Sequence, residues 1–191
     1  MNIKYAFLTS LKVFITFSIL LGIIYPLGIT AIAQITMRCT ANGSLIKDNG
    51  KIVGSKLIGQ EFTAPEYFYS RPSSAGYNAA DSGGSNLGPS SKKLMSSVAD
   101  RVKQVKAENN IKSKTVPADM VLTSASGLDP HISLENALLQ LPRVAKARKI
   151  SEDKIKKLIS KNTDSDFIGI WGQSGINVLK LNLALDSLTG K

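Results

Sequence analysis

A glycine-rich run at residues 82–89, Ser-Gly-Gly-Ser-Asn-Leu-Gly-Pro, is the segment of this chain most similar to a phosphate-binding loop. It precedes a segment with a helical pattern, and the N–H groups at a helix N-terminus can bind phosphate. Gly83 and Gly88 have the spacing of a Walker motif, but Pro89 stands where that motif requires its lysine. The sequence therefore argues against a nucleoside triphosphatase site and favours a tight structural loop packed against another segment.

Serine, aspartate and histidine occur together at residues 126–133, which raises the possibility of a hydrolase. His131 is the only histidine in the chain, and Asp129 is its near neighbour. Catalytic triads are assembled from separated segments, and the sequence has no Gly-x-Ser-x-Gly elbow. One histidine and one cysteine also cannot build a zinc site. We expect Asp129 to cap the turn and His131 to hydrogen-bond at the start of the next helix; a secreted or membrane-anchored hydrolase using His131 is the alternative.

Both segments are rich in glycine and small polar residues, and each leads into a predicted helix. Glycine allows close backbone approach and positive φ, which suits a docking loop. We expect the two segments to lie near one another, fixed by side-chain-to-backbone bonds of Asn86 and Asp129. They would form or support an interaction surface, or else be no more than well-made turns. The candidate residues in them are Ser82, Gly83, Gly84, Ser85, Asn86, Gly88, Gly127, Asp129 and His131.

A polar ridge is predicted on the helix that follows residue 133. It would comprise Gln140, Arg143, Lys146 and Arg148. A solvated helix face is the simplest interpretation, and a charged ridge that docks a partner is the other. Gln140 and Arg143 are therefore also candidate interaction residues.

The longest charge-free run extends from Val13 to Met37, which is 25 residues. A helix of this length spans roughly 37 Å, enough to cross a hydrocarbon core of ~30 Å. Transmembrane helices tolerate a proline such as Pro26. The sequence therefore predicts an N-terminal anchor at residues 1–37, with the span at about 13–36.

A cleaved signal peptide is the alternative to this anchor. Ala31 and Ala33 have the spacing of a signal peptidase site, but the apolar run exceeds the usual ~7–15 residues. A lipoprotein signal is excluded because Arg38, rather than a small residue, precedes Cys39. Positive charges on the two sides of the span nearly balance, so the sequence alone does not orient it.

Residues 38–191 hold 22 basic and 14 acidic side chains, a net charge of +8. The lysines are dispersed on presumptive helix faces, and no aromatic residues are interleaved with them for base stacking. We expect no nucleic-acid partner, and we interpret the charge as a solvated face near anionic lipid headgroups. The single cysteine does not indicate a compartment.

The soluble part, residues 38–191, is predicted to be one α+β domain with a small sheet and about three helices. Residues 45–46 and 52–53, separated by Asn49-Gly50, predict a β-hairpin that continues at 57–58. Residues 120–122 are a strand candidate, and the alternating leucines of 178–185 predict a strand that closes the sheet.

Helix signals fall between these strands. A long connection over 63–89 ends where Ser90 or Ser91 begins a helix with apolar residues at helical spacing. Another helix begins near Ser133, and Pro142 either kinks it or starts a second helix. Ser151 is expected to cap a further helix with Ile155, Leu158 and Ile159 inside.

Taken together, these segments resemble one family, the C subunit of the Kdp-type potassium-transporting P-type ATPase of bacteria. The motifs occur in family order and cover nearly the whole chain. They are residues 25–27, 41–46, 54–60, 67–73, 77–78, 82–89, 116–119, 126–133, 143–148 and 177–185.

This resemblance implies a non-catalytic accessory subunit, often described as a catalytic chaperone that raises the pump subunit's affinity for ATP. The implied partners are a channel-like potassium-selective subunit, an ATP-hydrolysing P-type pump subunit and a very small single-span subunit. The chain would have no cofactor of its own, since ATP and potassium are handled by the complex. It would sit in the cell (inner) membrane with its N-terminus cytoplasmic and its domain extracytoplasmic. Pro142 and the segment 170–174 depart from the family pattern.

Overall fold

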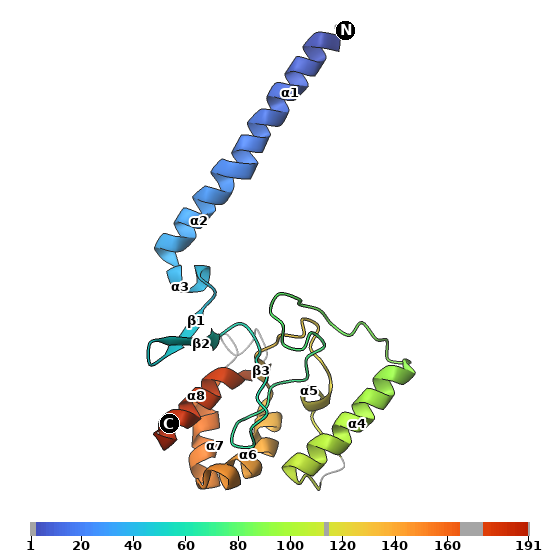
Figure 1. The fold of residues 1–191 in the computed structure, drawn as a ribbon, viewed down its shortest axis with the longest axis vertical. Coiled ribbons are helices and arrows are strands. Elements are labelled where there is room, and N and C mark those ends of the chain that lie inside the picture. Colours follow the sequence, from blue (N-terminus) through green and yellow to red (C-terminus); the bar gives the residue numbers. More distant parts are fainter. Residues whose placement is uncertain (1–2, 113–114, 165–173, 191) are drawn as a thin grey trace. The chain divides into compact units, whose positions relative to one another are not determined.

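The computed structural model describes residues 3–112, 115–164 and 174–190. The chain forms two compact units, Met1–Leu45 and Ile46–Lys191, which we describe separately. The elements of both are labelled in Figure 1. The predicted fold class, α+β after an N-terminal apolar helix, is confirmed, and the structure has small sheets and several helices in the α+β region.

The N-terminal unit is dominated by one long helix in three parts: α1 (Ile3–Ile19), the π-helical turn η1 (Leu20–Ile24) and α2 (Tyr25–Thr36). Residues Ile3–Thr36 are long and apolar enough to cross a membrane, so the helix begins earlier than the predicted span. The π-helical turn ends two residues before Pro26. Proline has no N–H and its ring crowds the preceding turn, so the wider turn, in which Tyr25 N donates to Leu20 O, accommodates it without breaking the helix.

A short helix, α3 (Arg38–Ala41), follows the long one after a break at Met37. The side-chain amides of Gln34 and Asn42 bond to each other reciprocally, at 3.3 and 3.2 Å. Asn42 also donates to the Arg38 carbonyl at 2.7 Å. The amide pair thereby fixes the change of direction at the end of α2.

The predicted hairpin is confirmed. Strands β1 (Leu45–Asp48) and β2 (Lys51–Ser55) form a two-stranded sheet. Asn49 and Gly50 both have positive φ, 46° and 80°, as the two-residue turn of a hairpin requires. Residues 57–58 do not continue the sheet; they lie in a turn in which Ser55 Oγ accepts from Leu57 N.

Residues 63–89 form a long connection without helix or strand, as predicted. We call its first part, residues 63–73, the strap. Phe68 in the strap is fully buried and belongs to the hydrophobic core. The strap therefore crosses the core without the backbone hydrogen bonds of a helix or sheet. Side chains must satisfy its N–H and C=O groups instead.

Three predicted helices are present: α4 (Lys92–Asn109), α6 (Leu134–Arg148) and α7 (Glu152–Lys161). Ser91 and Ser133 are side-chain N-caps, accepting from Leu94 N and Asn136 N. Ser151 occupies the N-cap position of α7 but makes no side-chain cap bond. Residues Ile155 and Ile159 of α7 are buried as expected.

Pro142 lies inside α6, so the prediction that it could start a second helix is wrong. Two segments that the sequence predicted as strands are helices. Residues 118–121 form α5 (Ala118–Val121) and residues 178–189 form α8 (Val178–Thr189). The buried residues of α8 are spaced as on a helix face, and Asn177 caps it by accepting from Lys180 N at 3.1 Å. The leucine alternation of 178–185 therefore reflects two adjacent helical stripes.

A second, three-stranded antiparallel sheet has the order β3 (His131–Ile132), β5 (Gly175–Asn177), β4 (Thr163–Asp164). Ile132 pairs with Ile176, and both enter the core. The remaining core residues come mainly from α6, α7 and α8, which Figure 1 shows together on one side of the domain.

Candidate interaction site

Two amide side chains hold the strap against the helices. Gln140 of α6 accepts from Tyr69 N at 2.7 Å and donates to Tyr69 O at 3.1 Å. Asn182 of α8 does the same for Phe68, at 2.9 and 3.0 Å. Gln140 and Asn182 are each only 2% exposed. Each amide thus satisfies both backbone polar groups of one residue, as a neighbouring antiparallel β-strand would.

Two arginines of α6 also donate hydrogen bonds to backbone carbonyls of the strap. Arg143 Nη1 donates to the carbonyls of Pro65 and Tyr67, at 2.6 and 3.0 Å, and its guanidinium lies 3.8 Å from the Tyr69 ring centroid. Arg148 Nε donates to Glu66 O at 2.9 Å, and its Nη2 pairs with Asp186 at 2.6 Å. Burial lowers the pKa of Arg143.

The predicted polar ridge is therefore not a solvated face. Gln140 is buried, the Arg148 side chain is only 3% exposed, and Arg143 is half-buried against the strap. Lys146 alone among the four is exposed. The interpretation failed because sequence spacing places these residues on one helix face but does not indicate that an irregular segment covers that face.

The two glycine-rich segments lie together, as expected; we call residues 82–89 and 124–133 the paired loops. Gly83 N donates to Ser126 O at 2.9 Å, and Ser82 Oγ donates to the same oxygen at 3.1 Å. A Cβ on Gly84 would lie 2.9 Å from Ala125 O. Gly127, with φ +68°, faces Gly83 O so closely that a Cβ would lie 2.8 Å from that oxygen. Glycine is required at both positions because the two backbones touch.

Of Asn86 and Asp129, the two residues expected to fix these loops by side-chain hydrogen bonds, only Asp129 makes such a bond among the described residues. Asp129 does so: its Oδ1 accepts from His131 N at 3.0 Å, which caps the turn. Asn86 makes no side-chain hydrogen bond with the described part of the chain, and instead contributes a positive φ of 52°. Ser82, Ser85, Asn86 and Gly88 are exposed. The exposed rim of the paired loops thus consists of small polar residues.

Asp129 also joins the paired loops to the strap. Its Oδ2 accepts from Arg71 Nη1 at 2.8 Å. Burial by itself raises the pKa of the Asp129 carboxyl, but hydrogen bonds from His131 and Arg71 outweigh it and hold that pKa below its ordinary value. The carboxylate is therefore ionised over the physiological range and acts as a structural junction.

His131 lies in β3 rather than at the helix start, which Ser133 occupies as N-cap. Its Nδ1 is 3.5 Å from Asp129 Oδ1. A cavity of about 490 Å³ opens beside it, with Asp119, Glu135 and Arg71 also in its wall. Within residues 3–112, 115–164 and 174–190, no hydroxyl is hydrogen-bonded to His131 and no group of three metal-ligating side chains occurs. The hydrolase alternative gains no support from this geometry.

Three residues that organise the site were not singled out as site residues from the sequence. Asp119 accepts from Ser133 N, Ser133 Oγ and Asn136 Nδ2, at 2.7, 3.1 and 2.9 Å, and so fixes the start of α6. Arg71 and Asn182 hold the strap at its two sides. All three lie within the motifs that carry the family resemblance, which was the signal available for them.

The architecture is that of a small α+β domain following a helix long and apolar enough to cross a membrane. A family model described as "K+-transporting ATPase, c chain" (KdpC) matches residues 7–187. The Potassium-transporting ATPase KdpC subunit of Mycobacterium tuberculosis strain H37Rv is 50% identical over 184 residues, covering 95% of this chain and 97% of that protein.

Similar relatives occur in other bacteria. The subunit of the same name from Rhodopseudomonas palustris strain TIE-1 is 49% identical over 180 residues, covering 87% of this chain and 89% of the relative. That of Koribacter versatilis is 46% identical over 181 residues, covering 94% and 93%. The chain therefore belongs to the KdpC family of potassium-transporting ATPase subunits, which confirms the resemblance. Of the two departures from the family pattern, Pro142 is accommodated within α6, and residues 170–173 lie outside the described residues.

Proposed function

We propose that this chain is a non-catalytic accessory subunit that supports assembly of an ATP-driven potassium uptake complex, in which another chain hydrolyses ATP. The paired loops carry this proposal, because they are rigidly fixed from within while their rim stays exposed. The carboxylate of Asp129, which the sequence could assign to chemistry, accepts from His131 N and from Arg71 instead. A site organised in this way would present a shape to a partner.

The partners are a channel-like potassium-selective subunit, an ATP-hydrolysing pump subunit and a small single-span subunit. The exposed rim would contact one of the first two. It comprises Ser82, Ser85, Asn86, Gly88, Ala125 and Ser126. Preformed loops of small residues suit docking because little side-chain entropy is lost on association. By stabilising the assembled pump, the subunit would raise that pump's affinity for ATP without itself binding nucleotide.

The domain is placed on the extracytoplasmic side, with the N-terminal helix as an uncleaved anchor. A protease site inserted at the hairpin turn beside Gly50, which is exposed, tests this placement. Protease added to intact spheroplasts should cut the chain there. Cleavage that occurs only after lysis would place the domain in the cytoplasm and contradict the proposal.

The non-catalytic role is tested with His131→Ala in the assembled complex. We expect the subunit to copurify with its partners and potassium-dependent ATP hydrolysis to stay within about twofold of wild type. The purified chain alone should hydrolyse neither ATP nor model esters. An intrinsic hydrolase activity of the chain that disappears with His131→Ala would establish the alternative, an anchored hydrolase.

A further inference from the structure

Helix α4 lies outside the hydrophobic core cluster of the domain. Of its residues Lys92–Asn109, only Asn109 is buried. The apolar stripe that predicted this helix, of Leu94, Val98, Val102 and Val105, is half-buried. The hydrophobic core cluster takes residues from the strap, one residue each from β3 and β5, and residues from α6, α7 and α8, and none from α4 among the residues described. Because apolar burial is the main source of packing stability, α4 gains less from its position than α6, α7 and α8, which supply most of the core.

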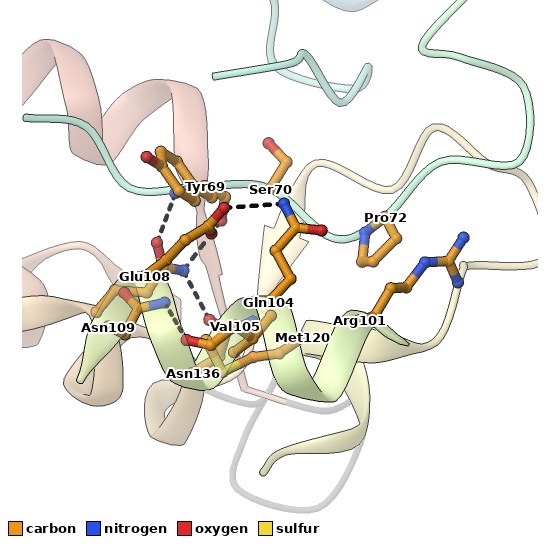
Figure 2. A pocket seen from close by; sticks show the side chains of 11 residues that line it. Tyr69, Ser70, Pro72, Arg101, Gln104, Val105, Glu108, Asn109, Met120 and Asn136 are labelled. Atoms are coloured by element: carbon orange, nitrogen blue, oxygen red, sulfur yellow. Dashed lines mark hydrogen bonds between the residues drawn. The ribbon is translucent and has the colours of Figure 1, made fainter. Parts of the chain in front are cut away.

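A cavity of about 200 Å³ lies under the C-terminal half of α4. Figure 2 shows its lining, with Arg101 and Glu108 from α4, Tyr69 from the strap, Met120 from α5 and Asn136 from α6. The cavity therefore occupies part of the region between α4 and the strap, α5 and α6, while α4 also contacts α5 and α6. Atoms on its walls lose the dispersion contacts that a closed interface would give.

The buried amides of this cavity already have partners. Gln140 bonds to Tyr69 and donates to Asn136 Oδ1 at 2.7 Å, while Asn136 donates to Asp119. Asn109 donates to Val105 O at 3.0 Å and accepts from Arg143. Since no buried lining group is left for a ligand, we interpret the cavity as a gap in packing between a helix and its support.

Among the contacts that the described residues make, two side-chain hydrogen bonds link α4 to α5 and α6 beside this cavity. Arg143 Nε of α6 donates to Asn109 Oδ1 at 2.9 Å. Arg101 Nη1 of α4 donates to Val121 O of α5 at 3.0 Å. A hydrogen bond of this kind contributes on the order of 1 kcal/mol or slightly more, so the pair is a modest tether.

We propose that α4 is a movable helix that swings away from α5 and α6, and that the Arg143–Asn109 and Arg101–Val121 bonds hold it closed. Arg143 also bonds the strap at Pro65 and Tyr67. Opening of α4 thus frees one bond of a guanidinium that positions the strap. The position of α4 is thereby linked to the strap and, through Arg71 and Asp129, to the paired loops.

A single buried thiol reports this opening. Cys39 is the only cysteine, so Cys39→Ser gives a background without thiols. Met120→Cys in that background places one thiol under α4, at a position that is 7% exposed. A bulky polyethylene-glycol maleimide cannot enter while α4 is closed. The labelling rate of the full chain in detergent micelles then measures how often α4 opens.

Asn109→Ala and, separately, Arg101→Ala each remove one tether. We expect either to raise the labelling rate at position 120 about 5–10-fold, the equivalent of one such hydrogen bond. Ala is also the better helix former, so faster labelling cannot come from a weakened helix. Gln104→Ala is the matched control and should leave the rate unchanged, because within the described residues the Gln104 side chain bonds only to Glu108 of the same helix.

A second reporter, Ala137→Cys, distinguishes opening of α4 from global unfolding. Ala137 is fully buried in α6. Its labelling should be at least about tenfold slower than that of position 120 and unaffected by either tether variant. Equal labelling rates at the two reporters, or acceleration of both by the same factor, would overturn the proposal. A rate at position 120 that neither tether variant changes would also overturn it. If one tether variant fails to fold, the other gives the same test.

Discussion

Arg71 and Asp129 are 58 residues apart in the chain and meet at 2.8 Å, where the guanidinium Nη1 donates to Oδ2. The same carboxylate caps the turn before β3 through His131 N. One side chain therefore joins the strap to the paired loops. The Nε of Arg71 is buried without a partner in the described residues, so the pairing with Asp129 is the side chain's principal anchor.

Replacing Asp129 by Asn removes the ionised acceptor while keeping its size. We expect the full chain in detergent to lose about 1–3 kcal/mol of stability at neutral pH, measured by thermal denaturation. Because the folded pKa of Asp129 is lowered, its contribution is present above the unfolded value, near 3.8, and is lost as pH falls below it. Asp100→Asn, at a side chain that is 70% exposed, is the control and should change little. Equal effects of the two variants would show that the Asp129 junction is unimportant.

Tyr77 should make the stability depend on alkaline pH. Burial, and then the charge of Glu61, raise the pKa of its hydroxyl from 10.0 to about 12, although Arg101 opposes this shift. Its hydroxyl donates to Arg71 O at 2.6 Å. A raised folded pKa gives stability that is present below pH 10 and is lost as pH rises from 10 to 12.

Thermal denaturation of Tyr77→Phe should therefore show a weaker decline over this pH range than the wild type. Ultraviolet titration should show that Tyr77→Phe lacks one tyrosine that ionises near pH 12 in the wild type. A wild-type decline that Tyr77→Phe reproduces in full would assign it to other groups.

The side-chain amides of Gln140 and Asn182, which bond the backbone of the strap, provide a third prediction. Gln140→Met leaves the N–H and C=O of Tyr69 without their partner in a buried site. We expect a loss of about 3 kcal/mol or more, from several unsatisfied groups of 1–3 kcal/mol each. Gln104→Met makes the same chemical change at an exposed position on α4. Denaturation of both variants gives the comparison, and similar stabilities would mean that the strap is held by packing alone.

Local signals accounted for the elements that the sequence predicted correctly. Asn49-Gly50 specified the hairpin turn, and Ser91 and Ser133 marked the helix starts, because these signals act through neighbouring residues. The strands β3, β4 and β5 have two or three residues, too few for a periodicity to be read. In α8 the leucines gave a period of two by coincidence, although Asn177 was an available cap signal.

The candidate site was predicted in part for a similar reason. Close approach of the paired loops followed from glycines such as Gly84 and Gly127, whose hydrogen atoms face another backbone. The roles of Gln140, Arg143 and Asn182 did not follow, because their partners are backbone groups more than 70 residues away. A side chain's distant backbone partner is fixed by the tertiary fold and leaves no spacing in the sequence.

The central claim is that the rim of the paired loops binds the subunit to the potassium pump. Substitutions at two adjacent glycines test it. Gly83 has no atom within 4 Å of an added Cβ and has no left-handed φ, so Gly83→Trp points into open space. An added Cβ at Gly84 meets Ala125 O at 2.9 Å, so Gly84→Val should disturb the loops themselves. Gly84→Val is thus the reference for loss of binding through loss of structure.

The decisive measurement is copurification of the Gly83→Trp subunit with the potassium pump, together with its melting temperature. We predict that Gly83→Trp melts within about 2 °C of wild type, since a surface change typically alters stability by less than about 0.5 kcal/mol. We also predict that its recovery in the complex falls at least about tenfold, with loss of potassium uptake at low external potassium. Full recovery of the Gly83→Trp subunit in an active complex would contradict the claim and leave the paired loops as structural turns.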